Sequence, residues 1–144
     1  MATLGDLLAT KGPGVVAVQP SDTVLQAANL MNDLNIGGVV VLDGDRLAGI
    51  FTERDVLRRV VAQELDPATT PVAEVMTTPV ITCPTDLTLE DCAALMTQRG
   101  VRHLPVQDGT GLVGVVSIRD LLAYKVSEQQ ATLDQMTHYL YDLR

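Results

Sequence analysis

The sequence predicts one domain of the α/β class, built from two pseudo-symmetric β-α-β-β-α units and followed by a C-terminal amphipathic helix. The chain repeats itself internally, and within each copy short apolar runs alternate with segments of helical spacing. Its 144 residues are 47% hydrophobic and 19% charged, a globular composition. A chain of roughly 150 residues buries about 68–70% of its unfolded surface, so a core can form without disulfides.

The repeat is the strongest of these observations. An ungapped alignment at an offset of 65 residues pairs 31–57 with 96–122, and nine of these 27 positions carry the same residue. The match includes polar positions such as Arg54-Asp55 with Arg119-Asp120, which chance similarity between two βα segments does not readily produce.

The elements follow in the same order in both copies. Short apolar runs ending before a proline predict the first strands, and apolar residues at helical spacing then predict a helix. Two further apolar runs around an Asp-Gly turn predict a hairpin, and a last helix opens at a hydroxyl residue. The predicted segments are strands 15–18 and 80–83, helices 24–31 and 89–96, hairpin strands 39–42 with 47–51 and 104–106 with 112–116, and helices opening at Thr52 and Ser117.

The boundaries come from composition. The polar, proline-bounded segment 66–71 is the predicted linker between a first unit, 3–65, and a second unit, 72–126, and 127–144 is the predicted C-terminal helix. Each unit has too few elements to cover both faces of its sheet. We therefore expect the two units to pack together as one domain.

Charge and composition exclude several functions. A formal net charge of −8 and 3% aromatic residues argue against nucleic-acid or acidic-membrane partners. The start of the chain lacks a basic, apolar secretion signal, so we expect a cytoplasmic protein. Cys83 and Cys92 match no metal or redox spacing and are expected to fill the core. We expect no metal site, no catalytic residues and no enzyme activity, because no nucleophile, metal-ligand or phosphate-loop motif is present.

The most informative pattern is a hydroxyl residue followed three positions later by aspartate, where a strand meets a helix. It occurs as Thr52 with Asp55 and as Ser117 with Asp120. One interpretation is a helix capping box, although such boxes prefer Glu or Gln at the acidic position. The other is that aspartate, too short to fold back well, points outward to accept hydrogen bonds from a ribose, with phosphate near the helix amides. Spacing alone supports both equally.

At these residues the chain from about 3 to 124 resembles a tandem pair of cystathionine-β-synthase (CBS) domains, also called a Bateman module. The resemblance rests on the Gly-apolar-apolar-Thr/Ser-x-x-Asp endings, the Leu-Met helix ends at 30–31 and 95–96, the segment 75–80 and the segment 102–106. It implies a stand-alone, prokaryotic-type regulatory module. Such a module binds AMP, ADP, ATP or S-adenosylmethionine between its repeats, as a regulatory ligand and not a cofactor.

The resemblance also implies site residues. Asp55 and Asp120 would hold ribose hydroxyls, with Thr52 and Ser117 near phosphate. The backbone of each first strand would line an adenine slot, and residues before the second strand of each copy would also face the cleft. The implied ligand-binding set is Ala17, Val18, Gly38, Val39, Thr52, Arg54, Asp55, Ile81, Thr82, Arg102, His103, Leu104, Pro105, Ser117, Arg119 and Asp120.

The two copies differ where phosphate would lie. The second offers Arg102-His103, and the first offers Gly37-Gly38, which supply space but no charge. The two clefts are therefore expected to be non-equivalent. Arg54 and Arg119 could contact phosphate or form salt bridges in their helices, and Lys11 is a further candidate phosphate contact.

A stripe of apolar residues near the C-terminus, called the C-terminal stripe below, has two interpretations. Apolar residues at 3–4 spacing predict an amphipathic helix that packs either on its own domain or on a second copy; they are Leu133, Met136, Leu140 and Leu143. By resemblance we expect a homodimer that acts on an effector protein. The alternative function is a ligand-free dimerisation or interaction module, in which the aspartates serve only as helix caps.

Overall fold

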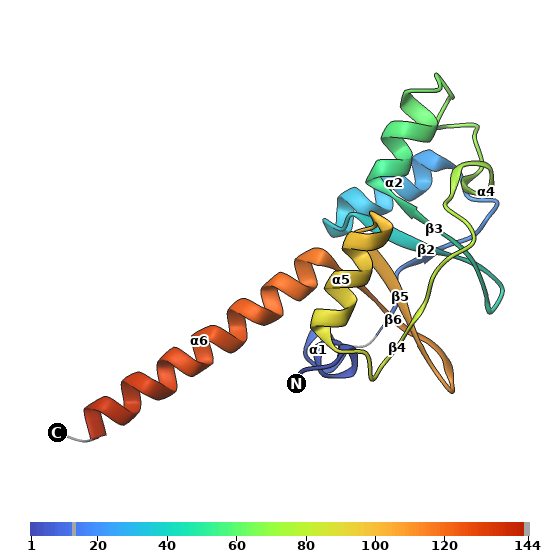
Figure 1. Ribbon diagram of the computed structural model, residues 1–144. Coiled ribbons are helices and arrows are strands. Elements are labelled where there is room, and N and C mark those ends of the chain that lie inside the picture. Colours follow the sequence, from blue (N-terminus) through green and yellow to red (C-terminus); the bar gives the residue numbers. More distant parts are fainter. Residues whose placement is uncertain (13, 143–144) are drawn as a thin grey trace.

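The computed structural model describes residues 1–12 and 14–142, which form two three-stranded sheets with helices around them and one long helix that leaves the body (Figure 1). The sheets have the same order, β1-β2-β3 and β4-β5-β6, with the first pair parallel and the second antiparallel. The elements are α1 (Leu4–Lys11), β1 (Ala17–Val18), α2 (Val24–Leu34), β2 (Gly38–Asp43), β3 (Arg46–Thr52), α3 (Glu53–Asp55), the π-helix η1 (Val56–Val61), α4 (Val72–Val75), β4 (Cys83–Pro84), α5 (Leu89–Arg99), β5 (His103–Asp108), β6 (Gly111–Ser117) and α6 (Ile118–Asp142).

The predicted fold class and the internal repeat are confirmed. Both hairpins have the same register, and a β-bulge interrupts each at the equivalent place, between Val41 and Leu42 and between Val106 and Gln107. A β-bulge is a specific local feature of a strand pair, so its presence at equivalent positions shows that the two hairpins have the same local structure.

Two predicted elements differ from those observed. The first strands are only two residues long, since the chain pairs with its neighbour for two positions and otherwise diverges from the sheet. The helix opening at Ser117 and the predicted helix 127–144 are one continuous helix, α6, because no proline or glycine interrupts it. Leu143 lies outside the described residues.

The short helices α1 and α4 are exchanged between the halves. Leu4 and Leu7 of α1 lie in the core of the second sheet, and Val72 and Val75 of α4 lie in the core of the first. Backbone hydrogen bonds secure both contacts, among them Leu4 N–H to the carbonyl of Leu87 at 2.9 Å and Val72 N–H to that of Asp22 at 2.8 Å. Each half therefore completes the core of the other, as expected for one domain.

A glycine makes room for each exchanged segment. A Cβ on Gly114 of β6 would lie 2.6 Å from Cδ2 of Leu8 in α1, and one on Gly49 of β3 would lie 2.5 Å from Sδ of Met76, just after α4. These glycines occupy equivalent positions in the repeat. They let the incoming segment lie directly against the sheet.

Both cysteines are buried in the second core, as predicted. Burial raises the pKa of the Cys92 thiol to about 12, with the adjacent Cys83 contributing. Among the described residues, no helix is long and apolar enough to cross a membrane.

We predict that Leu4→Ala lowers the free energy of unfolding by about 2–5 kcal/mol, because it opens a cavity in the core of the other half. The matched control is Leu34→Ala, whose side chain is 50% exposed, whereas Leu4 is fully buried. Surface changes of this kind stay within about 0.5 kcal/mol. Urea unfolding measures both, and equal effects would contradict the exchanged packing.

Candidate functional site

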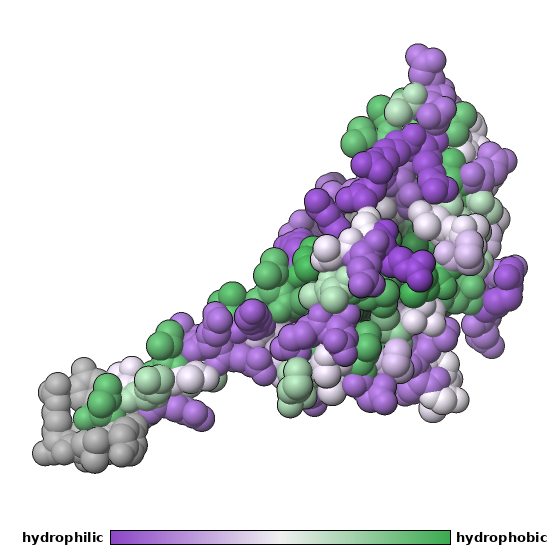
Figure 2. Space-filling model, viewed as in Figure 1, coloured by the Kyte–Doolittle hydropathy of each residue, from purple (hydrophilic) through white to green (hydrophobic). Residues whose placement is uncertain are grey.

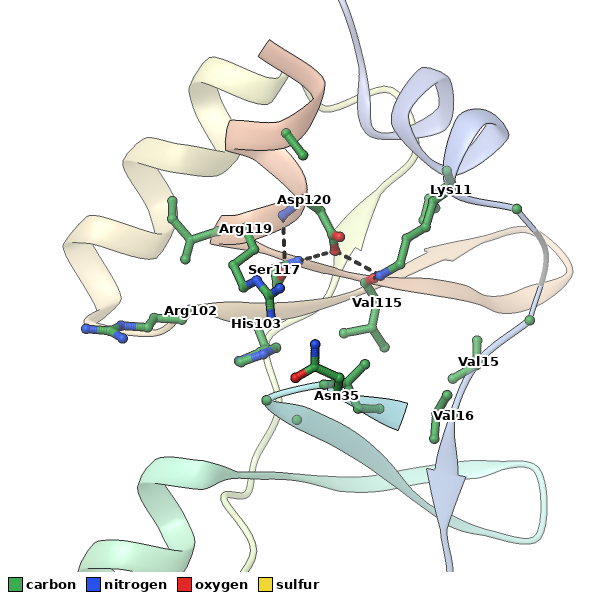
Figure 3. A pocket seen from close by; sticks show the side chains of 18 of the residues that line it. Lys11, Val15, Val16, Asn35, Arg102, His103, Val115, Ser117, Arg119 and Asp120 are labelled. Carbon is green, nitrogen blue, oxygen red and sulfur yellow. Dashed lines mark hydrogen bonds and ion pairs between the residues drawn. The ribbon is translucent and has the colours of Figure 1, made fainter. Parts of the chain in front are cut away.

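Two cavities lie between the halves, and the internal repeat relates them. The first cavity, of about 430 Å³, contains Asp120 and Ser117 together with residues of α1 and of the chain before β1 (Figure 3). The second cavity, of about 290 Å³, contains the equivalent Asp55 and Thr52. The structure thus brings each hydroxyl–aspartate pair to an opening between the halves.

In the first cavity, Asp120 is held from two sides. Its Oδ2 accepts a hydrogen bond from the backbone N–H of Ser117 at 2.8 Å and another from Nζ of Lys11 at 2.8 Å. Figure 3 shows Lys11 reaching from α1 to this carboxylate. Burial alone would raise the pKa of Asp120, but the hydrogen bonds from Lys11 and Ser117 lower it below its ordinary value. Oδ1 accepts no hydrogen bond from the described part of the chain.

In the second cavity, both oxygens of Asp55 are already engaged. Oδ2 accepts from the backbone N–H of Thr52 at 3.0 Å, while Oδ1 accepts from Oγ1 of Thr77 at 2.9 Å and lies 3.5 Å from Nε of Arg59. The side chain of Asp55 is 7% exposed, against 23% for Asp120. Asp55 therefore offers a ligand less exposed surface and fewer unused acceptor positions than Asp120 does.

The expectation that aspartate is too short to fold back is wrong. Asp55 and Asp120 both accept the backbone N–H of their hydroxyl partner, and each partner's oxygen accepts the aspartate N–H in return. Thr3 and Asp6 form the same capping box at the start of α1, and neither lines a cavity. Capping therefore does not distinguish a site. In Asp120 it leaves Oδ1 without a hydrogen bond from the described residues.

His103 lies where the two cavities meet and contributes to both. A Cβ on Gly38 would lie 3.1 Å from Cδ2 of His103, and one on Gly37 would lie 3.3 Å from its Nε2. A histidine of the other half thus occupies the space at Gly38, and at Gly37 it shares the space with Glu53, whose Oε1 would lie 2.6 Å from an added Cβ. Burial lowers the pKa of His103, and the negative charges of Asp120 and Glu53 oppose this shift only in part.

The cations are distributed unequally. The first cavity has Lys11, Arg102 and Arg119, and the second has four arginines, Arg54, Arg58, Arg59 and Arg102. Arg54 forms no salt bridge in its own helix; its Nη1 donates to the carbonyl of Gly100 in the other half at 2.7 Å. Lys11, a candidate phosphate contact, is engaged by Asp120.

Several predicted site residues line neither cavity. Val18, Val39 and Leu104 lie in the two cores, because their side chains point to the core face of their strands. Pro105, next to Leu104 in β5, is on the opposite face of that strand and is fully buried without lining either cavity. Ala17, Ile81 and Thr82 are only partly buried, yet they too lie outside both linings. Gly38 lines the first cavity, as do Arg102 and His103.

The structure adds residues that the sequence reasoning did not include. Val15 and Val16 line the first cavity because the chain joins the sheet only at Ala17, two residues later than predicted. Thr77 and Arg59 reach Asp55 from outside its motif. The pairing of Thr77 with Asp55 crosses 22 residues, so no local pattern indicates it.

Comparison with known proteins decides the family. The CBS domain family matches the chain twice, at residues 4–62 and 72–127. The chain belongs to the CBS-domain family. It is a tandem CBS pair, and such pairs are regulatory modules.

Similar proteins match the CBS pair over nearly their whole length. The CBS domain-containing protein YhcV of Bacillus subtilis is 37% identical over 131 residues, which cover 91% of both chains. The structure of a putative signal-transduction protein with CBS domains from Burkholderia ambifaria has a TM-score of 0.85 at 40% identity, covering 89% of this chain and 96% of that one. The CBS domain NE2398 has a TM-score of 0.82 at 40% identity, covering 86% and 97%.

We predict that the imidazole of His103 titrates below 6.5, its ordinary value, because burial disfavours the charged form. Proton NMR of a His138→Gln variant, which leaves His103 as the sole histidine, measures the midpoint. A midpoint at or above 6.5 would contradict the burial of this ring.

The same shift has a consequence for stability. The folded state binds the proton of His103 less readily than the unfolded state does. Neutral His103 therefore adds to the free energy of unfolding above pH 6.5, and this stabilisation is lost as the pH falls below 6.5. The difference in unfolding free energy between the wild type and His103→Gln should therefore shrink from about pH 7.5 to about pH 5.5.

Proposed function

We propose that this CBS pair is a sensor that binds an adenosine-containing ligand (AMP, ADP, ATP or S-adenosylmethionine) and that the first cavity is the principal site. The observation that supports this proposal most is Asp120: its Oδ1 accepts no hydrogen bond from the described residues, and with Ser117 it lines a cavity with apolar walls at the start of α6. Its volume of about 430 Å³ falls within the range of roughly 300–1,000 Å³ typical of small-molecule sites.

The ribose would bind at Asp120. A depressed pKa keeps this carboxylate ionised, and an ionised carboxylate is a strong acceptor for a pair of hydroxyl groups. Lys11 already neutralises part of its charge through Oδ2, so a diol meets an acceptor that is fixed in orientation.

The base would lie between apolar walls from both halves. Val15, Val16 and Ile36 line the first cavity from the first half, and Val115 and Ile118 line it from the second. The second cavity has few comparable groups, Ile50 and Val101 among them. An adenine ring therefore gains more from burial in the first cavity.

The phosphate would lie near the N-terminus of α6. The positive end of its helix dipole favours an anion, the hydroxyl of Ser117 and the imidazole of His103 add donors there, and Arg102 lines the same cavity. Arg102 and His103 also line the second cavity, whose arginines suit phosphate groups. We propose that the second cavity binds adenosine ligands more weakly, since Asp55 is already bonded to Thr77.

We predict that Asp120→Ala weakens AMP binding at least about tenfold, because a charged hydrogen bond contributes roughly 1.5–3 kcal/mol. Asp6→Ala is the matched control, since it removes the same capping interaction at a residue that lines neither cavity. Both variants should lose a similar stability, about 0.3–1.5 kcal/mol, and only Asp120→Ala should lose affinity.

Calorimetry measures the affinities after a thermal-shift screen of AMP, ADP, ATP, NAD and S-adenosylmethionine has selected the ligand. Asp55→Ala should have the smaller effect on affinity. Unchanged affinity in both Asp55→Ala and Asp120→Ala would overturn the site. The absence of saturable binding by any of these compounds would favour the ligand-free dimerisation module.

We also predict that Arg102→Ala weakens AMP binding by about tenfold but changes adenosine binding little, since only AMP carries a phosphate for the guanidinium. Arg99→Ala, which removes an exposed arginine of α5 outside both cavities, is the control. Equal losses for AMP and adenosine would show that Arg102 does not contact the phosphate.

A further inference from the structure

The outer part of α6 has no partner among the described residues of its own chain. The first two turns pack on the second core through Ile118, Leu121 and Tyr124. Beyond them, every described side chain from 125 to 140 is exposed, and the helix extends away from the body (Figure 1). For the described residues, the interpretation that the C-terminal stripe packs back on its own domain is therefore wrong.

The exposed apolar residues of α6 form a single seam. Figure 2 shows hydrophobic side chains recurring along the protruding helix among hydrophilic ones. The large hydrophobic ones are between 56% and 63% exposed, and together with Gln129 they are spaced alternately four and three residues apart; they are Leu122, Val126, Leu133, Met136 and Leu140. This 3.5-residue period is that of helices packed side by side in a coiled coil.

Charge indicates what covers the seam. The positions that flank it hold Ala123, Gln130, Thr132 and Thr137, with Lys125 as the one charged residue among them. The acidic residues Glu128 and Asp134 lie on the opposite side of the helix. A chain of net charge −8 thus keeps its acids away from the surface on which an identical chain would repel them.

We propose that α6 pairs with α6 of a second copy as a parallel, in-register, two-stranded coiled coil along this seam. Gln129 sets the direction. In a parallel pair each seam residue meets its own counterpart, so the two Gln129 amides can hydrogen-bond to each other. In an antiparallel pair Gln129 would face Val126 or Leu133 of the second copy, and a buried amide would remain without a partner.

The first test compares two double variants of the full chain by sedimentation equilibrium. Leu133→Glu with Met136→Glu places charges in the seam, and Ala131→Glu with Gln135→Glu makes the same charge change on the outer side of the helix. The wild type should have twice the 15.4 kDa protomer mass. The seam variant should dimerise at least about 100-fold more weakly, and the control should remain a dimer.

Any of three results would overturn the proposal: a wild type that stays monomeric, a wild type that forms a larger assembly, or a seam variant that dimerises as well as the control. Folding does not confound this test, because the substituted side chains are exposed in the protomer. Circular dichroism and the thermal unfolding of each variant verify this point.

The second test concerns direction and register. Gln129→Cys should form a covalent dimer with oxidised glutathione, since counterpart seam positions in parallel helices lie within disulfide distance. Ala131→Cys, on the outer side, should not. Cys83 and Cys92 are buried and do not compete. A dimer in which Gln129→Cys fails to cross-link, or cross-links no better than Ala131→Cys, would refute the parallel register.

Discussion

The exchange of α1 and α4 between the halves is the contact on which the rest of the molecule depends. Each short helix is continuous in sequence with one repeat and completes the core of the other, so neither half has a finished core alone. The exchange holds the two halves together, and residues of both halves line the two cavities. It also brings Lys11, the last residue of α1, to Asp120 at the start of α6.

The sequence indicated the topology but not this exchange. Strand order and hairpins follow from local periodicity, and the repeat confirms each reading twice. Which core a short apolar helix joins depends on tertiary packing, and residues 3–11 fit either half by pattern alone. The repeated glycines Gly49 and Gly114 were visible in the sequence, yet only the structure shows that each admits a segment from the other half.

For the site, the sequence predicted the polar residues better than the apolar ones. Asp55 and Asp120 line the cavities because each motif stands where a strand ends at the junction of the halves. Thr3 and Asp6 form the same capping hydrogen bonds away from both cavities. A hydroxyl residue followed three positions later by aspartate therefore specifies only a helix cap, and its place in the fold decides whether it can also bind a ligand. Val39 and Leu104 belong to the cores, since neighbouring strand residues alternate between faces and the sequence does not reveal which face meets the cleft.

One helix connects the two proposals. The first turn of α6 contributes Ser117 as its cap, Arg119 and Asp120 to the first cavity, and the same helix continues without interruption into the exposed seam. A ligand bound at that turn contacts the element through which two copies would meet. If dimerisation changes the affinity for the ligand, the ligand must change the dimerisation constant by the same factor, because binding free energies are reciprocal. The size of that factor depends on how differently the ligand contacts the first turn of α6 in the monomer and in the dimer. A ligand that makes the same contacts in both does not shift the equilibrium between them.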